Sequence, residues 1–335
     1  MKEQLQGMLW ECANLTFQHD LGNVVQALRG TSAAFEATQV PRKVVKLERQ
    51  IGQGQSGEVW LGELTAAPSW GREPGTTVAV KLSKAEEGDA QVRILLEVRM
   101  MHLLPHPFLI RMLAMVTVDF PVLLCMEYME GGDLKSFLRA CRPTLEHPRM
   151  VLTGDDFVRM AGQVAGALAF LEERKIVHRD VAARNVLVNK DASIVKLGDM
   201  GMARNVYKKE QYLQTSSARL PLAWMAPESL HDSVFTHKTD IWSFGVLVWE
   251  MTSFARTPFG ALGAQEIVAE VNAGRYLAQP ASCNEWTWGL IQRCWQVRPV
   301  ARPSFKALET ELVARTRQEP QQLPQVDGDE GEAVV

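Results

Sequence analysis

The amino-acid sequence predicts an α+β chain with a smaller strand-rich lobe followed by a larger helical lobe, and two observations indicate this. Before Gly131-Gly132, apolar or β-branched runs separated by turn residues occur at 44–47, 59–62, 78–82 and 115–127. After these glycines, apolar residues recur at helical spacing over 155–174, 239–253, 264–273 and 285–296. Strands first and helices afterwards are typical of α+β chains.

In the first hundred residues, segments with strand or helix patterns alternate with segments rich in proline and glycine. Residues 1–43 carry only an irregular apolar stripe, so we treat them as an N-terminal extension without an assigned role. Pro41-Arg42 precedes the first strand. The segment 65–77 is expected to be a long loop because it contains Pro68, Gly71, Pro74 and Gly75. Residues 90–103 have helical periodicity and supply the one helix expected in this lobe.

Composition excludes several classes of protein. The 335 residues are 46% hydrophobic and 22% charged, which is typical of globular chains. A net charge of −3 gives no reason to expect nucleic-acid binding. The five cysteines form no close metal-type pair, so reduced thiols in the cytosol are expected. No run of about eighteen uncharged apolar residues is present to predict a membrane span, and residues 1–20 do not have the pattern of a signal peptide.

The most informative stretch is His178-Arg179-Asp180-Val181-Ala182-Ala183-Arg184-Asn185. Asp180 can accept the proton of an attacking hydroxyl, and Asn185 can bind a metal ion through its side-chain oxygen. Asp199 follows fourteen residues after Asn185, directly before Met200-Gly201. A base, an amide ligand and a second carboxylate in this order are what phosphoryl transfer from Mg-ATP needs.

These residues match H-R-D-x-x-x-x-N, and the chain resembles the protein kinases. Ala182-Ala183-Arg184 is similar to the insert of the tyrosine-kinase branch, which disfavours serine/threonine specificity. The run 131–139 (GGDLKSFLR) resembles the insulin-receptor, anaplastic lymphoma and leukocyte tyrosine kinase group. The resemblance implies a bilobal kinase fold over 44–314, with an N-lobe at about 44–128, a C-lobe at about 129–314 and a disordered acidic tail at 315–335. Residues 1–43 would then be juxtamembrane-like or unassigned.

A glycine-rich pattern, G-x-G-x-x-G-x-V, covers residues 52–59. Such glycines let a backbone approach phosphates closely, but the pattern also occurs in dinucleotide sites, where a helix follows directly. Here residues 58–62 have strand character, which favours a hairpin that covers ATP. The resemblance implies nucleotide contacts from ten residues: Gly52, Gln53, Gly54, Gly57, Val59, Ala79, Lys81, Glu127, Met129 and Leu187.

Lys81 ends the strand Val78-Ala79-Val80-Lys81 and would bind the α/β-phosphates. It needs a carboxylate to orient it, and Glu97 on the expected helix is the best candidate, with Glu86 and Glu87 as rivals. The run 122–134 resembles the kinase hinge. There, adenine would bond to main-chain groups of Glu127 and Met129, and Met126 would control access behind it.

The resemblance also assigns the catalytic roles. Asp180 would be the base, and Arg184 would hold the region of the substrate hydroxyl. Asn185 and Asp199 would bind Mg²⁺ or Mn²⁺, since both offer hard oxygens. Arg179 would neutralise a phosphorylated activation loop, whereas His178 would be structural.

Asp199-Met200-Gly201 departs from the usual Asp-Phe-Gly. Methionine is apolar and adaptable, so we expect Met200 to pack with Met101, Met112 and His178 and the enzyme to be active. The alternative is a pseudokinase that serves as an interaction module, supported by Met200 and the 65–77 loop.

Tyr207 and Tyr212 lie between Gly201 and Ala226-Pro227-Glu228, in a segment similar to a receptor-kinase activation loop. We expect both to be phosphorylated, with Tyr212 as the principal site, through self-association and trans-autophosphorylation. The protein substrates would carry tyrosine, and the chain would be cytoplasmic, either free or as the intracellular part of a membrane receptor.

The closing motifs also follow the kinase pattern. Residues 221–228 (PLAWMAPE) resemble the tyrosine-kinase substrate platform, although Ala223 replaces the usual Lys or Arg. Asp240 would anchor the backbone of the catalytic loop, and Glu228 would pair with Arg302.

Overall fold

The computed structural model describes residues 33–54, 57–66, 74–82, 88–118, 121–143, 146, 148–205, 212–213 and 221–317. These residues form two compact units. The first contains the described residues up to Glu130 and those of 198–205, and the second contains Gly131–Leu197 and the described residues from 212 onward. The boundary expected near residue 128 therefore does not divide the chain into two consecutive pieces, because residues 198–205 return to the first unit.

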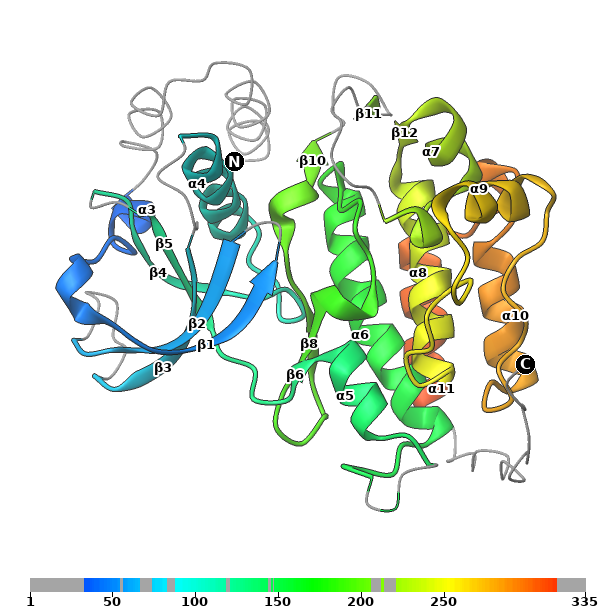
Figure 1. The fold of residues 1–335 in the computed structure, drawn as a ribbon, viewed down its shortest axis with the longest axis horizontal. Coiled ribbons are helices and arrows are strands. Elements are labelled where there is room, and N and C mark those ends of the chain that lie inside the picture. The colour runs from blue at the N-terminus through cyan, green and yellow to red at the C-terminus, as the bar shows by residue number, and fades with distance from the viewer. Residues whose placement is uncertain are drawn as a thin grey trace. The chain divides into compact units, whose positions relative to one another are not determined.

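The first unit is built on a five-stranded sheet of order β1-β2-β3-β5-β4, in which every neighbouring pair is antiparallel (Figure 1). Its strands are β1 (Val45–Gly54), β2 (Gly57–Leu64), β3 (Thr76–Leu82), β4 (Met112–Val116) and β5 (Leu123–Glu127). Two expectations were wrong in detail. The apolar run 115–127 is two strands, and β3 begins inside the expected loop because Thr76 and Thr77 continue the ladder opposite Leu64 and Glu63.

One helix, α4 (Gly88–Leu103), packs against β4 and β5 of this sheet (Figure 1). The opposite-facing side chains of the strands form an apolar cluster that includes Val78, Val80 and Cys125. The short helix η3 (Met200–Met202) also packs on α4 and precedes β10 (Arg204–Asn205). Helix α4 thus carries contacts to both parts of the first unit.

The fold begins before residue 44, where the sequence pattern places its start. Helix α3 (Ala33–Glu36) and the short helix η1 (Arg42–Val44) belong to the first unit. The Val40 N–H donates to the Met115 carbonyl at 2.9 Å, and the Met115 N–H donates to the Thr38 carbonyl at 2.9 Å. The Phe35 ring lies edge-on to the His102 ring of α4, with 4.9 Å between centroids. Residues 33–44 therefore cover the edge of β4 and the end of α4.

The second unit is mainly helical. Its helices are α5 (Leu134–Ala140), α6 (Gly154–Glu173), α7 (Pro227–Asp232), α8 (His237–Thr252), α9 (Ala264–Asn272), α10 (Glu285–Cys294) and α11 (Phe305–Thr316). Short strands and 3₁₀ turns connect them: β6 (Gly132–Asp133), β7 (Ile176–Val177), η2 (Ala183–Asn185), β8 (Val186–Val188), β9 (Val195–Leu197), β11 (Tyr212–Leu213), η4 (Leu222–Trp224), β12 (Val234–Phe235) and η5 (Pro299–Ala301). Because α11 ends at Thr316, the expected tail cannot begin at 315, and residues 318–335 lie outside the described part.

Helix α8 is the central helix of this unit. A capping box of Thr236 and Thr239 starts it, and every residue from Thr239 to Thr252 is buried. No helix among the described residues is long and apolar enough to cross a membrane. The α+β fold class predicted from the sequence is confirmed, with the five-stranded sheet in the first unit and a mainly helical second unit.

Gly245 lets α8 and α10 approach closely, and its replacement by alanine is expected to destabilise the fold. A Cβ at this position would lie 2.8 Å from the Cβ of Cys294 and 2.7 Å from the Trp295 indole nitrogen. The overlap should outweigh the better helix propensity of alanine, for a net loss of about 1–2 kcal/mol in the free energy of unfolding. Gly289→Ala on α10 is the control, because nothing lies within 4 Å of its Cβ position. In thermal unfolding, the Tm of Gly245→Ala should be lower than that of the wild type, and the Tm of Gly289→Ala should equal or exceed it. The reverse order would contradict the close packing of α8 on α10 at Gly245.

Candidate functional site

Lys81, Glu97 and Asp199 meet in the first unit, although they come from β3, α4 and the residue before η3. The Lys81 Nζ lies 2.7 Å from Glu97 Oε2 and 2.9 Å from Oε1, and 3.3 Å from Asp199 Oδ1. Lys81 and Glu97 are 6% and 3% exposed. The structure therefore brings Lys81 together with Glu97, the candidate favoured from the sequence, whereas its rivals Glu86 and Glu87 lie outside the described residues.

The charge of this buried lysine is held by its carboxylate neighbours. Burial would lower the pKa of Lys81, but the Glu97 and Asp199 carboxylates more than reverse this and move the pKa above its usual range. Lys81 is thus a fixed positive charge at neutral pH. Asp199 differs in being accessible, since 37% of its side chain is exposed.

Asp199 has a left-handed backbone, with φ of 51°, and its carboxylate accepts a hydrogen bond from the Gly201 N–H at 3.2 Å. A non-glycine residue in this region is strained, and such strain is concentrated at functional positions. Met200 follows it and is 5% exposed; Met101 and Met112 are also buried in this unit. The four-residue column expected with His178 is not tested, because His178 belongs to the second unit.

The expected nucleotide contacts share one face of the sheet. Val59 is opposite Lys81, and Ala79 is opposite Met126, while alternate residues such as Val80 and Cys125 point into the apolar cluster. Gly52 is paired with Val59, and the β1–β2 ladder continues through Gln53 to Gly54 opposite Gly57. A strand therefore follows the glycines, so the dinucleotide interpretation of this motif is wrong. Residues 55–56 lie outside the described part.

The segment expected to bind adenine follows β5. The Glu127 N–H donates to the Arg111 carbonyl at 3.0 Å, so the main-chain group of Glu127 that can serve a ligand is its carbonyl. The Arg111 N–H in turn donates to the Glu127 carboxylate at 2.8 Å. Met129 is 7% exposed. Leu187, the remaining expected contact, lies on β8 of the second unit, opposite Asp133.

Asp180 in the second unit is surrounded by the other catalytic candidates of its loop. The Asn185 Nδ2 donates to the Asp180 main-chain oxygen at 2.7 Å and to its Oδ2 at 2.7 Å. The Arg184 guanidinium forms an ion pair with Asp180 Oδ1. The Asp180 side chain remains 13% exposed, so its carboxylate is held in place and still accessible to a small group.

The loop itself is held from below by Asp240, as predicted. The carboxylate of Asp240 accepts the His178 N–H at 2.7 Å and the Arg179 N–H at 2.9 Å. Arg179 has a φ of 72°, and its guanidinium lies 4.4 Å from the centre of the Phe235 ring. Burial raises the pKa of Asp240 to about 6, against the opposing effect of His178 and these N–H groups.

Residues 45–312 match the family described as protein tyrosine and serine/threonine kinase. The chain belongs to this kinase family. It is 37% identical over 270 residues to the insulin-like growth factor 1 receptor of Bos taurus, covering 80% of this chain and 42% of the receptor. It is 38% identical over 270 residues to the insulin receptor of Xenopus laevis, covering 80% of this chain and 20% of that receptor. The chain thus spans less than half the length of these relatives, and the resemblance to the insulin-receptor group noted from the sequence is confirmed.

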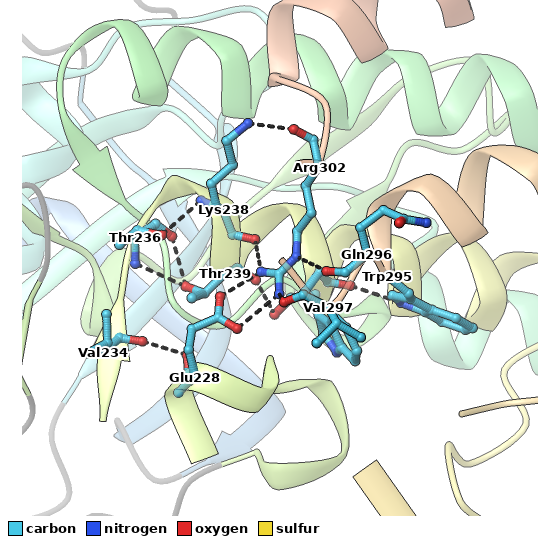
Figure 2. Close-up of polar contacts among 12 residues, drawn as sticks. Glu228, Val234, Thr236, Lys238, Thr239, Trp295, Gln296, Val297 and Arg302 are labelled. Atoms are coloured by element: carbon cyan, nitrogen blue, oxygen red, sulfur yellow. Dashed lines mark hydrogen bonds and ion pairs between the residues drawn. The ribbon is translucent and has the colours of Figure 1, made fainter. Parts of the chain in front are cut away.

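Arg302 joins the segments that carry two further kinase motifs (Figure 2). Its Nη1 and Nη2 lie 2.6 Å and 2.9 Å from the two carboxylate oxygens of Glu228 on α7, as predicted. The Arg302 Nε donates to the Gln296 carbonyl at 2.8 Å and Nη1 to the Lys238 carbonyl at 2.8 Å. The Lys238 Nζ donates back to the Arg302 carbonyl at 2.6 Å. The end of the activation segment is thereby fixed to the start of α8.

The two expected phosphorylation sites differ in what the structure describes. Tyr207 lies outside the described residues. The main chain of Tyr212 forms β11, where it is paired with Phe235 of β12. The Phe235 ring is also in contact with the guanidinium of Arg179. The residue paired with Tyr212 therefore contacts the arginine that is expected to neutralise a phosphorylated loop.

Sequence reasoning missed Glu250 on α8, a carboxylate with only 1% of its surface exposed. It accepts hydrogen bonds from the Ala183 N–H and from the Trp224 indole, each at 2.9 Å. The available signal was a single acidic residue within the apolar run Trp249-Glu250-Met251. Neither of its partners is near it in sequence, so the pattern alone could not indicate what it binds.

Acid stability is expected to depend on His237 at the start of α8. Burial, with Lys175 and Lys238 nearby, lowers the pKa of His237 to about 4, whereas the unfolded value is about 6.5. The unfolded chain therefore takes up the proton first, and stability is lost as the pH falls from about 6.5 towards 4. Asp240, with a pKa raised to about 6, has the opposite slope between about 4 and 6.

His237→Gln should remove the loss of stability that protonation of His237 causes in acid. We expect equal stability of variant and wild type at pH 7.5, and an advantage of the variant on the order of 2 kcal/mol at pH 5. Urea unfolding at both pH values measures this. Identical losses on acidification would show that His237 does not contribute.

Proposed function

We propose that the chain is the catalytic domain of a protein tyrosine kinase, which transfers the γ-phosphoryl group of ATP to tyrosine hydroxyls. The observation that carries this proposal is the position of Asp180 between Asn185 and Arg184, beside the Ala182-Ala183-Arg184 insert. Such a site works by positioning and charge neutralisation, without a covalent enzyme intermediate. The insulin-receptor relatives support tyrosine as the acceptor.

The nucleotide would be held by the face of the sheet that carries Val59, Ala79 and Lys81. Lys81, kept charged and oriented by Glu97 at 2.7 Å, would pair with the α/β-phosphates. The glycines of the β1–β2 hairpin, with Gln53 between them, would offer main-chain N–H groups to the phosphates. Adenine would use the carbonyl of Glu127 and main-chain groups of Met129, and the resemblance also assigns Leu187 to the nucleotide contacts.

Kinases of this family use ATP with a divalent metal ion, and the donors present fit Mg²⁺ or Mn²⁺. Because the Asn185 Nδ2 donates a hydrogen bond to Asp180, the side-chain oxygen of Asn185 is the atom that would bind the metal ion. Asp199 adds an exposed carboxylate. No group of three or more His, Cys, Asp or Glu side chains within the described residues could form a metal site. Mg²⁺ is often bound by one or two protein oxygens together with substrate phosphates. The bound ion would neutralise phosphate charge.

Asp180 would orient the acceptor hydroxyl and accept its proton as the phosphoryl group is transferred. Arg184 would hold the same region, since its guanidinium already lies between Asp180 and the Trp224 ring, 4.4 Å from the ring centre. Trp224 belongs to the segment that resembles the substrate platform. The protein substrate would therefore lie across η4 with its tyrosine directed at Asp180.

Incubation of the purified chain with Mg-ATP and a tyrosine-containing peptide tests this proposal. We expect phosphotyrosine to form in the peptide and no phosphoserine or phosphothreonine above background in matched peptides. Asp180→Asn serves as the background. Incorporation into serine peptides only, or equal incorporation by the wild type and Asp180→Asn, would overturn it.

We further propose that the enzyme is activated by phosphorylation of Tyr212, with Tyr207 as a second site, through self-association in the cytoplasm, either as a free kinase or as the intracellular part of a membrane receptor. A phosphate adds roughly −1.5 to −2 charge and favours arginine partners, and Arg179 is the expected one.

The variant Tyr207→Phe/Tyr212→Phe is expected to lose the activation that follows preincubation with ATP, by about tenfold or more in kcat/KM. Single variants should show Tyr212 as the larger contributor. Initial rates before and after preincubation measure this, with Tyr276→Phe as the control, since the Tyr276 ring packs edge-on to Trp242, with 5.0 Å between centroids. Full activation of the double variant would contradict the switch.

A further inference from the structure

One face of α8 carries three polar side chains that all bond to catalytic or substrate-facing segments. Asp240 accepts the N–H groups of His178 and Arg179. The Ser243 hydroxyl donates to the Trp224 carbonyl at 2.7 Å, and Glu250 accepts the Trp224 indole at 2.9 Å. Residues three and seven apart lie on the same side of a helix. Trp224 is thus held by α8 at both ends, its carbonyl by Ser243 and its ring by Glu250.

Glu250 is more than a packed core residue. A single oxygen, Oε2, accepts both the Trp224 indole N–H and the Ala183 N–H. Burial raises the pKa of this carboxyl, and the two donors oppose the shift. Burying a carboxylate costs free energy unless it is hydrogen-bonded, and an apolar side chain would avoid that cost. What the carboxylate adds is a pair of hydrogen bonds that fixes the position of the Trp224 ring on η4 relative to Ala183 of the catalytic-loop insert.

The Trp224 ring in turn contacts Arg184, whose guanidinium is bound to Asp180. The Arg184 guanidinium lies 4.4 Å from the centre of the Trp224 ring and forms an ion pair with Asp180. The indole N–H fixes the plane of the ring, and the ring face fixes the guanidinium. A continuous set of contacts therefore runs from Glu250 through Trp224 and Arg184 to Asp180, entirely within the second unit.

We propose that Glu250 is a positioning residue for the phosphoacceptor. By bonding to Ala183 and Trp224 together, it sets the distance between the substrate platform and Asp180. This inference rests on the proposed function, because it concerns how a tyrosine is presented to the base. It predicts that Glu250 matters for phosphoryl transfer to a peptide and much less for transfer to water, since water does not need the platform.

Three variants test the proposal against the wild type: Glu250→Ala, which removes both bonds; Glu250→Gln, which keeps an acceptor oxygen; and Trp224→Phe, which keeps a ring without its N–H. Peptide phosphorylation and ATP hydrolysis without peptide are both measured, with kcat and KM separated. Arg275→Ala is the matched control, because Arg275 forms an exposed ion pair with Glu270 on α9.

We expect Glu250→Ala to lower kcat/KM for the peptide by about 10- to 100-fold, the usual cost of a misplaced acceptor. Hydrolysis of ATP should fall by less than about threefold. Glu250→Gln should restore most of the loss, Trp224→Phe should show the same selective loss in smaller degree, and Arg275→Ala should match the wild type.

Equal losses in peptide phosphorylation and ATP hydrolysis would overturn the proposal, since they indicate general support of the loop. If Glu250→Ala does not fold, Trp224→Phe decides, because it removes the indole N–H that Glu250 accepts and keeps an aromatic ring beside Arg184; an unselective loss or no loss in that variant also overturns it. A wild type that phosphorylates no tyrosine peptide would refute the proposed function, and with it this inference. Normal tyrosine phosphorylation by every variant would refute this inference alone.

Discussion

Replacement of Asp180 by asparagine is expected to lower kcat for peptide phosphorylation by about 10²- to 10⁴-fold. Asparagine has nearly the same shape, and its oxygen can still accept the Asn185 Nδ2 bond that Asp180 accepts at 2.7 Å. What it loses is the negative charge that pairs with Arg184 and the carboxylate that, in the proposed function, would accept the proton of the substrate hydroxyl. The loss should therefore fall on turnover, whereas the KM for ATP should change by less than about threefold.

Steady-state kinetics with a tyrosine peptide measure this effect, and circular dichroism with thermal unfolding checks the fold. The informative control is Asp191→Asn, since Asp191 is exposed and bonds within its own turn, to Ser193 at 2.7 Å. A variant that keeps more than about a tenth of wild-type kcat would show that Asp180 is not the proton acceptor, and an unfolded variant would show that its charge is needed for the loop itself.

Glu228→Gln is expected to be the most destabilising single substitution named here, lowering the free energy of unfolding by about 3 kcal/mol. The Arg302 side chain is 0% exposed, and Glu228 supplies both carboxylate oxygens to it (Figure 2). Glutamine removes the balancing charge and leaves the guanidinium buried, with only neutral carbonyl partners such as Gln296 and Lys238. A buried charge without its counter-charge is costly in free energy.

Urea unfolding of the wild type and the variant measures the difference. Glu270→Gln is the matched control: it breaks an exposed pair with Arg275, and we expect its unfolding curve to overlay that of the wild type. Arg302→Met should recover part of the loss in combination with Glu228→Gln, because no charge is then left buried. Equal effects of the two glutamine substitutions would contradict the weight given to burial.

The parts of the site that the sequence predicts are those carried by short, local patterns. Asp180, Asn185 and Asp199 lie within a span of twenty residues, and the nature of the side chains limits their chemistry. Glu97 could be favoured over its rivals because it lies in the middle of an apolar helical run. Asp240 and the pair Glu228–Arg302 were predicted because the resemblance supplies contacts between distant segments.

The parts that were missed depend on contacts that no local pattern contains. Glu250 bonds to residues 67 and 26 positions away, so its spacing along α8 reveals neither partner. Helix α11 shows a weak apolar stripe in its sequence, and it is its packing on α6 near Gly162 and Leu312 that stabilises it. The run 115–127 looked continuous because β4 is buried throughout and β5 is buried over its first three residues, and burial removes the alternation of apolar and polar residues that marks a strand.

The long-range bonds of α8 also bear on how the protein is made. The N–H of His178 donates to the carboxylate of Asp240, which is 62 residues further along the chain and is therefore synthesised later. At a synthesis rate of roughly 5–20 residues per second, the ribosome needs roughly 3–12 s to add those residues. For that interval the nascent catalytic loop lacks its anchor, and its polar backbone must be satisfied by water or by a chaperone. Catalytic competence is thus acquired late in translation, after the loop that carries the base has already left the peptidyl-transferase centre.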